Sequence, residues 1–335
     1  MQAFDITRRQ AQRPLRPAAQ PDVIDAERLL VARELRGRFQ VVRSLGRGGM
    51  GAVFLARDLV LQRVVAIKVL HADLMECESA RERFRREARI AARLEHPGVA
   101  TLHSFGEAGG VLYMVMRFVE GESLADRLRR TGRIDATETR SLLADLAATL
   151  AYAHAQGVVH RDLKPENILI ERDTGRPVLT DFGVSTLPWS ESEQVAAPRA
   201  GGTPHFMAPE QLAGDAETGG GADVYALGVL GYLMLSGVLP FTGRTAQEIA
   251  AGHLAGTPVP LGLLAPRAPA DLLATLSRCM AKDPLARWPS AGALGDALLR
   301  TEPPSLLDRV CAVVRRLAGR RARRTRRDGR LSLVY

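Results

Sequence analysis

A glycine-rich loop near the N-terminus is the first segment whose residues suggest chemistry. It reads Gly46-Arg47-Gly48-Gly49-Met50-Gly51 and lies between two strand-like segments. Glycines let a hairpin approach a phosphate closely while its backbone N–H groups remain able to donate. A plain glycine-rich hairpin and a dinucleotide-binding loop are alternatives. The dinucleotide loop needs a helix directly after it, whereas residues 52–58 (AVFLARD) look like a strand, so we discount it.

The most specific pattern in the chain is His160-Arg161-Asp162-Leu163-Lys164-Pro165-Glu166-Asn167, which Asp181-Phe182-Gly183 follows. The two motifs resemble the catalytic and metal-binding loops of the eukaryotic-type (Hanks-type) serine/threonine protein kinase family. The glycine loop and the high alanine and arginine content resemble its bacterial branch. The resemblance covers residues 39–299. It implies an α+β, bilobal protein-kinase-like fold with a small β-rich N-lobe and a large α-helical C-lobe.

The resemblance also implies roles for the residues of these loops. Phosphoryl transfer in this family depends mainly on positioning and on charge neutralisation. Asp162 would orient the substrate hydroxyl and accept its proton, and Lys164 would neutralise the γ-phosphate. Asn167 and Asp181 would hold Mg²⁺, with Mn²⁺ as an alternative, because hard cations prefer oxygen ligands. We expect ATP-dependent transfer of the γ-phosphoryl group to serine and threonine hydroxyls of proteins, since a lysine at position 164 resembles that class of kinase.

A lysine on a strand-like segment follows the glycine loop. A single lysine is by default a solvated surface residue, but Lys68 in Val65-Ala66-Ile67-Lys68 stands where protein kinases carry a lysine for the α- and β-phosphates. Such a lysine needs a carboxylate to position it. Glu87 and Glu82 compete for this part on the helix expected over residues 80–94. We prefer Glu87, because the family places this glutamate in the middle of the helix among apolar residues.

The family resemblance further implies an apolar slot for adenine between the lobes. Met116 occupies the gatekeeper position, and the backbone of residues 117–119 would bond the base. Ordinary core packing is an equal alternative for each apolar residue taken alone. The full set predicted for ATP is Leu45, Gly46, Arg47, Gly48, Gly49, Met50, Gly51, Val53, Ala66, Lys68, Glu87, Met116, Val119 and Leu169.

The segment between Asp181 and Ala208-Pro209-Glu210 matches the activation segment of the family. Thr203 resembles the threonine that contacts the catalytic aspartate. Arg161 resembles an arginine that pairs with a phosphate on this segment. One hypothesis is autophosphorylation at Ser190 or Ser192, in trans within a transient homodimer. The alternative is an unmodified loop whose glutamates partly serve Arg161.

Three further matches suggest structural residues rather than chemistry. Glu210 and Arg287 resemble a buried ion pair of the family, in which a lone partner would be an uncompensated buried charge. Asp223 resembles the residue that bonds the backbone of the catalytic loop. It begins an apolar stretch, residues 222–240, which we interpret as a buried helix and not as a membrane span.

The elements that must position these residues divide the chain into three parts. Residues 1–38 form a disordered extension with a short helix near residues 22–36. Residues 39–299 form the kinase domain, with an N-lobe over 39–116, a hinge over 117–121 and a C-lobe over 122–299. A strand–turn–strand arrangement through Val159, residues 168–170 and residues 178–180 would fix the ends of the catalytic loop. Residues 300–335 form a basic tail with an amphipathic helix.

The charge of the chain is concentrated in that tail. Residues 305–335 hold ten arginines and two aspartates, a net +8 that leaves +1 of the total +9 for the remainder. The tail could be an interfacial helix on anionic lipid, a nucleic-acid arm, or a helix docked on the chain's own surface. No aromatic residue lies among the arginines, so base stacking and specific nucleic-acid binding are not expected.

The remaining composition is that of a cytoplasmic enzyme, with the inner membrane surface as an alternative location. Cys77, Cys279 and Cys311 lie far apart, which disfavours a zinc site or disulfides and fits a reducing compartment. The N-terminus lacks the apolar core of a signal peptide.

Two other functions stay open: a catalytically silent scaffold and a small-molecule kinase. Intact Lys68, Asp162, Asn167 and Asp181 count against the scaffold, and the activation segment counts against the small-molecule kinase.

Overall fold

The computed structural model describes residues 21–182, 204–214 and 219–300. Ser190, Ser192, Thr203, Cys311 and the basic tail lie outside these residues. The chain divides into two compact units, Met1–Leu298 and Leu299–Tyr335, and the first of them contains the two lobes described below.

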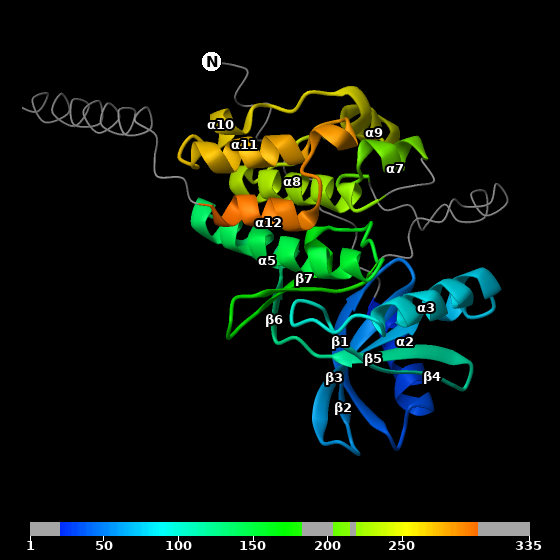
Figure 1. Cartoon of the computed structure of the whole chain (residues 1–335). Coiled ribbons are helices and arrows are strands. Elements are labelled where there is room, and N and C mark those ends of the chain that lie inside the picture. The colour runs from blue at the N-terminus through cyan, green and yellow to red at the C-terminus, as the bar shows by residue number, and fades with distance from the viewer. Residues whose placement is uncertain (1–20, 183–203, 215–218, 301–335) are drawn as a thin grey trace, which may run out of the picture. The chain divides into compact units, whose positions relative to one another are not determined.

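The N-lobe is built on one antiparallel sheet with the strand order β1-β2-β3-β5-β4 (Figure 1). Two α-helices and a short 3₁₀ helix accompany it. The elements are α2 (Pro21–Glu34), β1 (Phe39–Arg47), β2 (Gly51–Asp58), β3 (Arg63–Leu70), η1 (Ala72–Leu74), α3 (Glu78–Ala91), β4 (Leu102–Ala108) and β5 (Val111–Arg117).

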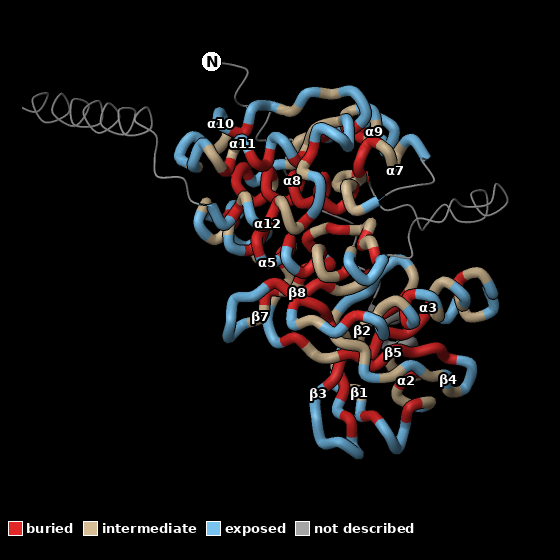
Figure 2. Tube along the Cα trace, in the orientation of Figure 1, coloured by how far each residue is buried: buried red, intermediate tan, exposed pale blue. Residues whose placement is uncertain are grey.

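Both faces of the sheet are buried along most of its inner strands β3 and β5, which explains why these two strands are mainly apolar. On one face, Leu70 and Met114 pack against Phe84 of α3. On the other face, Ile67 and Val115 belong to a second core. Val31 of α2 and Leu35, which follows the helix, complete this second core from outside the sheet. In Figure 2, stretches of the N-lobe strands are accordingly coloured as buried.

The C-lobe is mainly helical and has its own core. Its elements are β6 (Gly121–Ser123), α4 (Leu124–Thr131), α5 (Ala136–Ala155), η2 (Pro165–Asn167), β7 (Ile168–Glu171), β8 (Pro177–Leu179), α7 (Pro209–Ala213), α8 (Gly221–Ser236), α9 (Ala246–Ala255), α10 (Leu261–Leu264), α11 (Ala270–Cys279), η3 (Pro284–Ala286) and α12 (Ala291–Leu299). Nearly every residue of α8 is buried, as expected for an apolar helix inside a large domain. Among the described residues, no helix combines the length and the apolar content that crossing a membrane requires.

The strand expected at Val159 is absent. This residue lies in the irregular loop between α5 and η2. The backbone N–H groups of His160 and Arg161 donate to the carboxylate of Asp223 instead of to a neighbouring strand, at 2.9 and 2.8 Å. A side chain of α8 therefore holds this part of the loop. The other two segments form the antiparallel pair β7 and β8.

Candidate active site

Three ionisable side chains from distant parts of the chain meet between the lobes. Lys68 lies on β3, Glu87 on α3 and Asp181 after β8. The Lys68 Nζ atom lies 2.5 Å from Glu87 Oε1 and 2.9 Å from Asp181 Oδ1. Lys68 and Glu87 are each 7% exposed, whereas the side chain of Asp181 is 37% exposed. The ammonium group is thus fixed from two sides, and one of its partners remains open to solvent.

The pKa values of the three groups reflect their mutual contacts. Burial alone would lower the pKa of Lys68, but the carboxylates of Asp181 and Glu87 outweigh burial and raise it. Burial raises the pKa of Glu87, and the ammonium of Lys68 opposes that shift. Burial also acts to raise the pKa of Asp181, yet the charge of Lys68 and its hydrogen bond lower it overall. Lys68 therefore remains a cation and Asp181 an anion at neutral pH.

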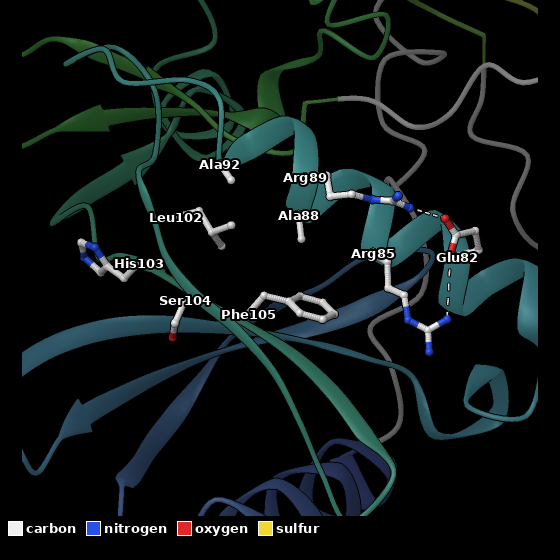
Figure 3. A pocket seen from close by; sticks show the side chains of 9 residues that line it. All are labelled: Glu82, Arg85, Ala88, Arg89, Ala92, Leu102, His103, Ser104 and Phe105. Carbon is white, nitrogen blue, oxygen red and sulfur yellow. Dashed lines mark hydrogen bonds and ion pairs between the residues drawn. The ribbon is translucent and has the colours of Figure 1, made fainter.

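Glu82, the competing partner for Lys68, lies elsewhere. It pairs with Arg89 and Arg85 on the surface of α3. Figure 3 shows these three side chains at the edge of a cavity of about 530 Å³ between α3 and β4, which none of the residues predicted for ATP lines. Glu87 is thus the contact of Lys68.

The catalytic loop brings together the side chains of Asp162, Lys164 and Asn167. Lys164 Nζ lies 2.5 Å from Asp162 Oδ2. The side-chain amide of Asn167 donates from Nδ2 to the Asp162 backbone oxygen at 2.9 Å and to Asp162 Oδ2 at 3.2 Å. The amide therefore turns its carbonyl oxygen away from Asp162. The carboxylate of Asp162 is oriented by two neighbours and is one-third exposed.

Two residues of the site have an uncommon backbone conformation. Arg161 has a φ of +63° and Asp181 a φ of +55°, in the left-handed region that side chains other than glycine rarely adopt. The Arg161 N–H donates to Asp223 Oδ1 at 2.8 Å, and its carbonyl accepts from Gln211 Nε2 at 3.0 Å. Because both backbone groups of Arg161 are bonded, the surroundings hold this strained conformation. No motif in the sequence pointed to Gln211.

The aspartate of the metal motif is tied to the catalytic loop through its neighbours. The Thr180 N–H donates to the backbone oxygen of Asn167 at 2.9 Å. The His160 imidazole lies 3.1 Å from the Thr180 carbonyl and packs on the ring of Phe182, with centroids 4.7 Å apart. These contacts place Asp181 beside Asn167, although 14 positions separate them in the chain.

The glycine loop closes on itself and lies tightly against β3. The Gly48 N–H donates to the Gly51 carbonyl at 2.8 Å. A Cβ atom added at Gly51 would meet the Val69 carbonyl oxygen at 2.1 Å, so only glycine allows this approach. The strand β1 extends to Arg47, and the first two residues of the predicted loop therefore belong to a strand.

The residues predicted for the adenine slot lie on both sides of the hinge. Ala66 pairs with Met116 across β3 and β5, and both are buried. Val119 packs in one cluster with Leu169 of β7. Leu45 and Val53 are half-buried on β1 and β2.

The predicted structural ion pair is present and fully engaged. Arg287 Nη1 and Nη2 each lie 2.7 Å from an oxygen of Glu210. The Arg287 side chain has no solvent exposure and also donates to the backbone oxygens of Gly221 and Ala281. The pair joins the start of α7 to the loop before α12. Fork-shaped pairs of this kind are directional and strong.

Comparison with known proteins decides the family. The family described as protein kinase domain matches residues 39–296, which is more than three quarters of the chain. This chain belongs to the protein kinase family. The resemblance inferred from the sequence motifs is thereby confirmed.

Bacterial serine/threonine-protein kinases are among the similar proteins. Kinase pkn2 of Myxococcus xanthus is 43% identical over 270 residues, which cover 79% of this chain and 32% of pkn2. Kinase PrkC of Bacillus subtilis is 35% identical, covering 78% of this chain and 40% of PrkC. Kinase PknA of Mycobacterium tuberculosis is 39% identical, covering 79% of this chain and 61% of PknA. The chain thus spans about a third to three fifths of the length of these relatives.

A solved structure shows the same fold. The crystal structure of the PknI kinase domain from Mycobacterium tuberculosis matches with a TM-score of 0.60 and 30% identity, covering 78% of this chain and 95% of that one. The bilobal α+β kinase fold expected from the sequence is therefore confirmed.

Proposed function

We propose that this chain is an ATP-dependent serine/threonine protein kinase. One observation carries the proposal: the ammonium of Lys68 lies within bonding distance of both Glu87 and Asp181, in a chain whose Asp162 is bonded to Lys164 and Asn167. Family membership alone would also suit a silent relative. A scaffold has no need for a buried lysine held by two carboxylates beside an intact catalytic loop.

The residues of this site fit the parts that phosphoryl transfer requires. The oxygen of the substrate hydroxyl would bond to the γ-phosphorus, while the bond between that phosphorus and the β–γ bridging oxygen breaks. Asp162 would accept the proton that the hydroxyl loses. Lys164, which forms an ion pair with Asp162, would neutralise negative charge on the phosphoryl group that is transferred. Lys68 would hold the α- and β-phosphates, and Glu87 would keep it in place. The glycine loop would cover the phosphates with backbone N–H groups.

The donor atoms fit a magnesium ion. The Asn167 amide directs Nδ2 to Asp162 and thus presents its oxygen on the other side. Asp181 is anionic and partly exposed. These are hard oxygen donors, which Mg²⁺ and Mn²⁺ prefer. A bound ion would neutralise part of the phosphate charge, and the role of the protein would be to hold Asn167 and Asp181 beside each other.

The other predictions from the sequence extend this proposal. We place the kinase domain at residues 39–299 and its substrates among proteins with serine or threonine hydroxyls. Autophosphorylation at Ser190 or Ser192, in trans, would supply a phosphate for Arg161. Mapping of phosphopeptides over residues 185–203 after incubation with ATP would test it, and unmodified peptides from an active preparation would exclude it.

A transfer assay tests the main proposal. Radiolabelled ATP, Mg²⁺ and a generic protein substrate are incubated with the wild-type chain, with Asp162→Asn and with Lys68→Met. We expect the wild type to label the protein and each variant to lose several orders of magnitude in rate, because the variants remove the proton acceptor and the phosphate-binding cation. Melting curves of the three proteins control for folding.

The same assay separates the alternatives. A scaffold would label nothing above background in the wild type. A small-molecule kinase would consume ATP in the presence of metabolite pools but leave the protein substrate unlabelled.

A further inference from the structure

A histidine outside the predicted site contacts the glycine loop. His71 follows β3 directly, three positions after Lys68, and precedes the 3₁₀ helix η1. It is 5% exposed. An isolated histidine carries no signal in the sequence, and it matches none of the motifs described above. Its place in the fold is what brings it to the phosphate loop.

Three contacts join His71 to this loop. Its imidazole Nε2 lies 2.9 Å from the Gly48 carbonyl oxygen. Its backbone N–H donates to the Met50 carbonyl at 3.0 Å. The Arg47 guanidinium approaches the imidazole Nδ1 from Nε and Nη2, both at 3.4 Å. One residue therefore contacts both sides of the turn that Gly48 and Gly51 close.

The partners determine where the imidazole carries its proton. A carbonyl oxygen can only accept, so Nε2 must donate to Gly48. A guanidinium can only donate, so Nδ1 must accept from Arg47. A ring with its proton on Nε2 and a lone pair on Nδ1 satisfies both contacts. Gly48 then has its N–H bonded to Gly51 and its carbonyl bonded to His71, which leaves this glycine little of its usual freedom.

We propose that His71 is a positioning residue for nucleotide binding, acting through the glycine loop. A loop with four glycines must lose conformational entropy when it closes over phosphates. The imidazole ties that loop to the end of β3, the strand that carries Lys68. It therefore orders the loop before ATP binds. The free energy of ATP binding is then reduced less by the cost of ordering the loop. The inference rests on the proposed kinase function, because it assumes that the loop binds ATP.

Three substitutions test this contact. His71→Gln keeps an amide N–H near the position of Nε2, whereas His71→Asn is shorter and His71→Ala has no donor. We expect Ala and Asn to raise the KM for ATP about three- to tenfold, the range that the loss of one hydrogen bond would give, with kcat within twofold of wild type. Gln should restore KM to within about twofold. The affinity for a fluorescent ATP analogue, measured without phosphoryl transfer, should rank the variants in the same way: Gln close to wild type, and Ala and Asn weaker.

The outcomes separate this inference from the proposed function. Wild type that neither binds the analogue nor labels protein would contradict the kinase function itself. Wild type that does both, with all three variants equal to it in KM and analogue affinity, would overturn the role of His71. So would variants that lose kcat and melting temperature equally, with no rescue by Gln, because a purely structural histidine behaves in that way.

Discussion

At the scale of single residues, the site depends on charges that are buried only because they have partners. Lys68 is a cation in a nearly closed environment, and its two carboxylates make this tolerable. His253 of α9 shows the opposite solution. It is fully buried, its Nδ1 lies 2.9 Å from the Tyr225 hydroxyl, and no carboxylate compensates a positive charge there among the contacts described. Burial first, then the charge of Lys282 and the proximity of His205, lower its pKa to about 4.

This pKa predicts a pH dependence of stability. Between about pH 6.5, the ordinary value for His253, and about pH 4, the unfolded chain binds a proton that the folded chain does not. The contribution of His253 to stability is therefore lost as the pH falls through this window, by up to about 3 kcal/mol. Urea unfolding of wild type and His253→Asn at several pH values checks it. A difference between the two proteins that stays constant from pH 7 to pH 4.5 would show that the folded His253 titrates normally.

At the scale of elements, the N-lobe includes a helix that precedes the strand where the family match begins. Val31 of α2 is 1% exposed and Leu35 is 4% exposed, and both pack with Phe39 and Tyr113 in the core on the sheet face opposite α3. This face would otherwise leave apolar side chains in water. The sequence predicted a short helix near residues 22–36, but an amphipathic pattern does not say what a helix covers. We infer that α2 is part of the folding unit of the N-lobe.

A matched pair of substitutions measures this contribution. Leu35→Ala should lower the free energy of unfolding by about 2–4 kcal/mol, because it removes a buried side chain and leaves a cavity. Leu29→Ala, on the same helix but 65% exposed, should change it by less than about 0.5 kcal/mol. Denaturant unfolding of both variants is the measurement. Equal, small effects would mean that the segment is only loosely associated with the lobe.

At the scale of the whole molecule, charge is divided very unevenly. Residues 305–335 carry +8 of the total +9, so the catalytic body is nearly neutral. A neutral body has little attraction for anionic surfaces, whereas a cluster of arginines next to apolar residues at helical spacing suits an anionic bilayer. We propose attachment to such a surface as the role of the tail.

Deletion of residues 305–335 should abolish co-sedimentation with vesicles that contain anionic lipid. The expected bound fraction falls to the level found with zwitterionic vesicles, and salt should weaken binding of the full chain because screening weakens exposed charges. The rate of phosphoryl transfer serves as the control for an intact kinase domain. An unchanged bound fraction after deletion would end the lipid proposal.

The sequence by itself determined the family, the two lobes and the motifs, because the glycine loop, the motif at residues 160–167 and the Asp181-Phe182-Gly183 motif stand at spacings that few other folds use. Only the tertiary structure decided which side chains meet. Glu87 and Glu82 are five positions apart on one helix, and the face each occupies relative to β3 selects Glu87. Gln211 contacts the backbone of a loop that is distant in sequence, and His71 contacts a loop that folds back onto it. Such contacts depend on how elements pack, and a linear pattern carries no record of that packing.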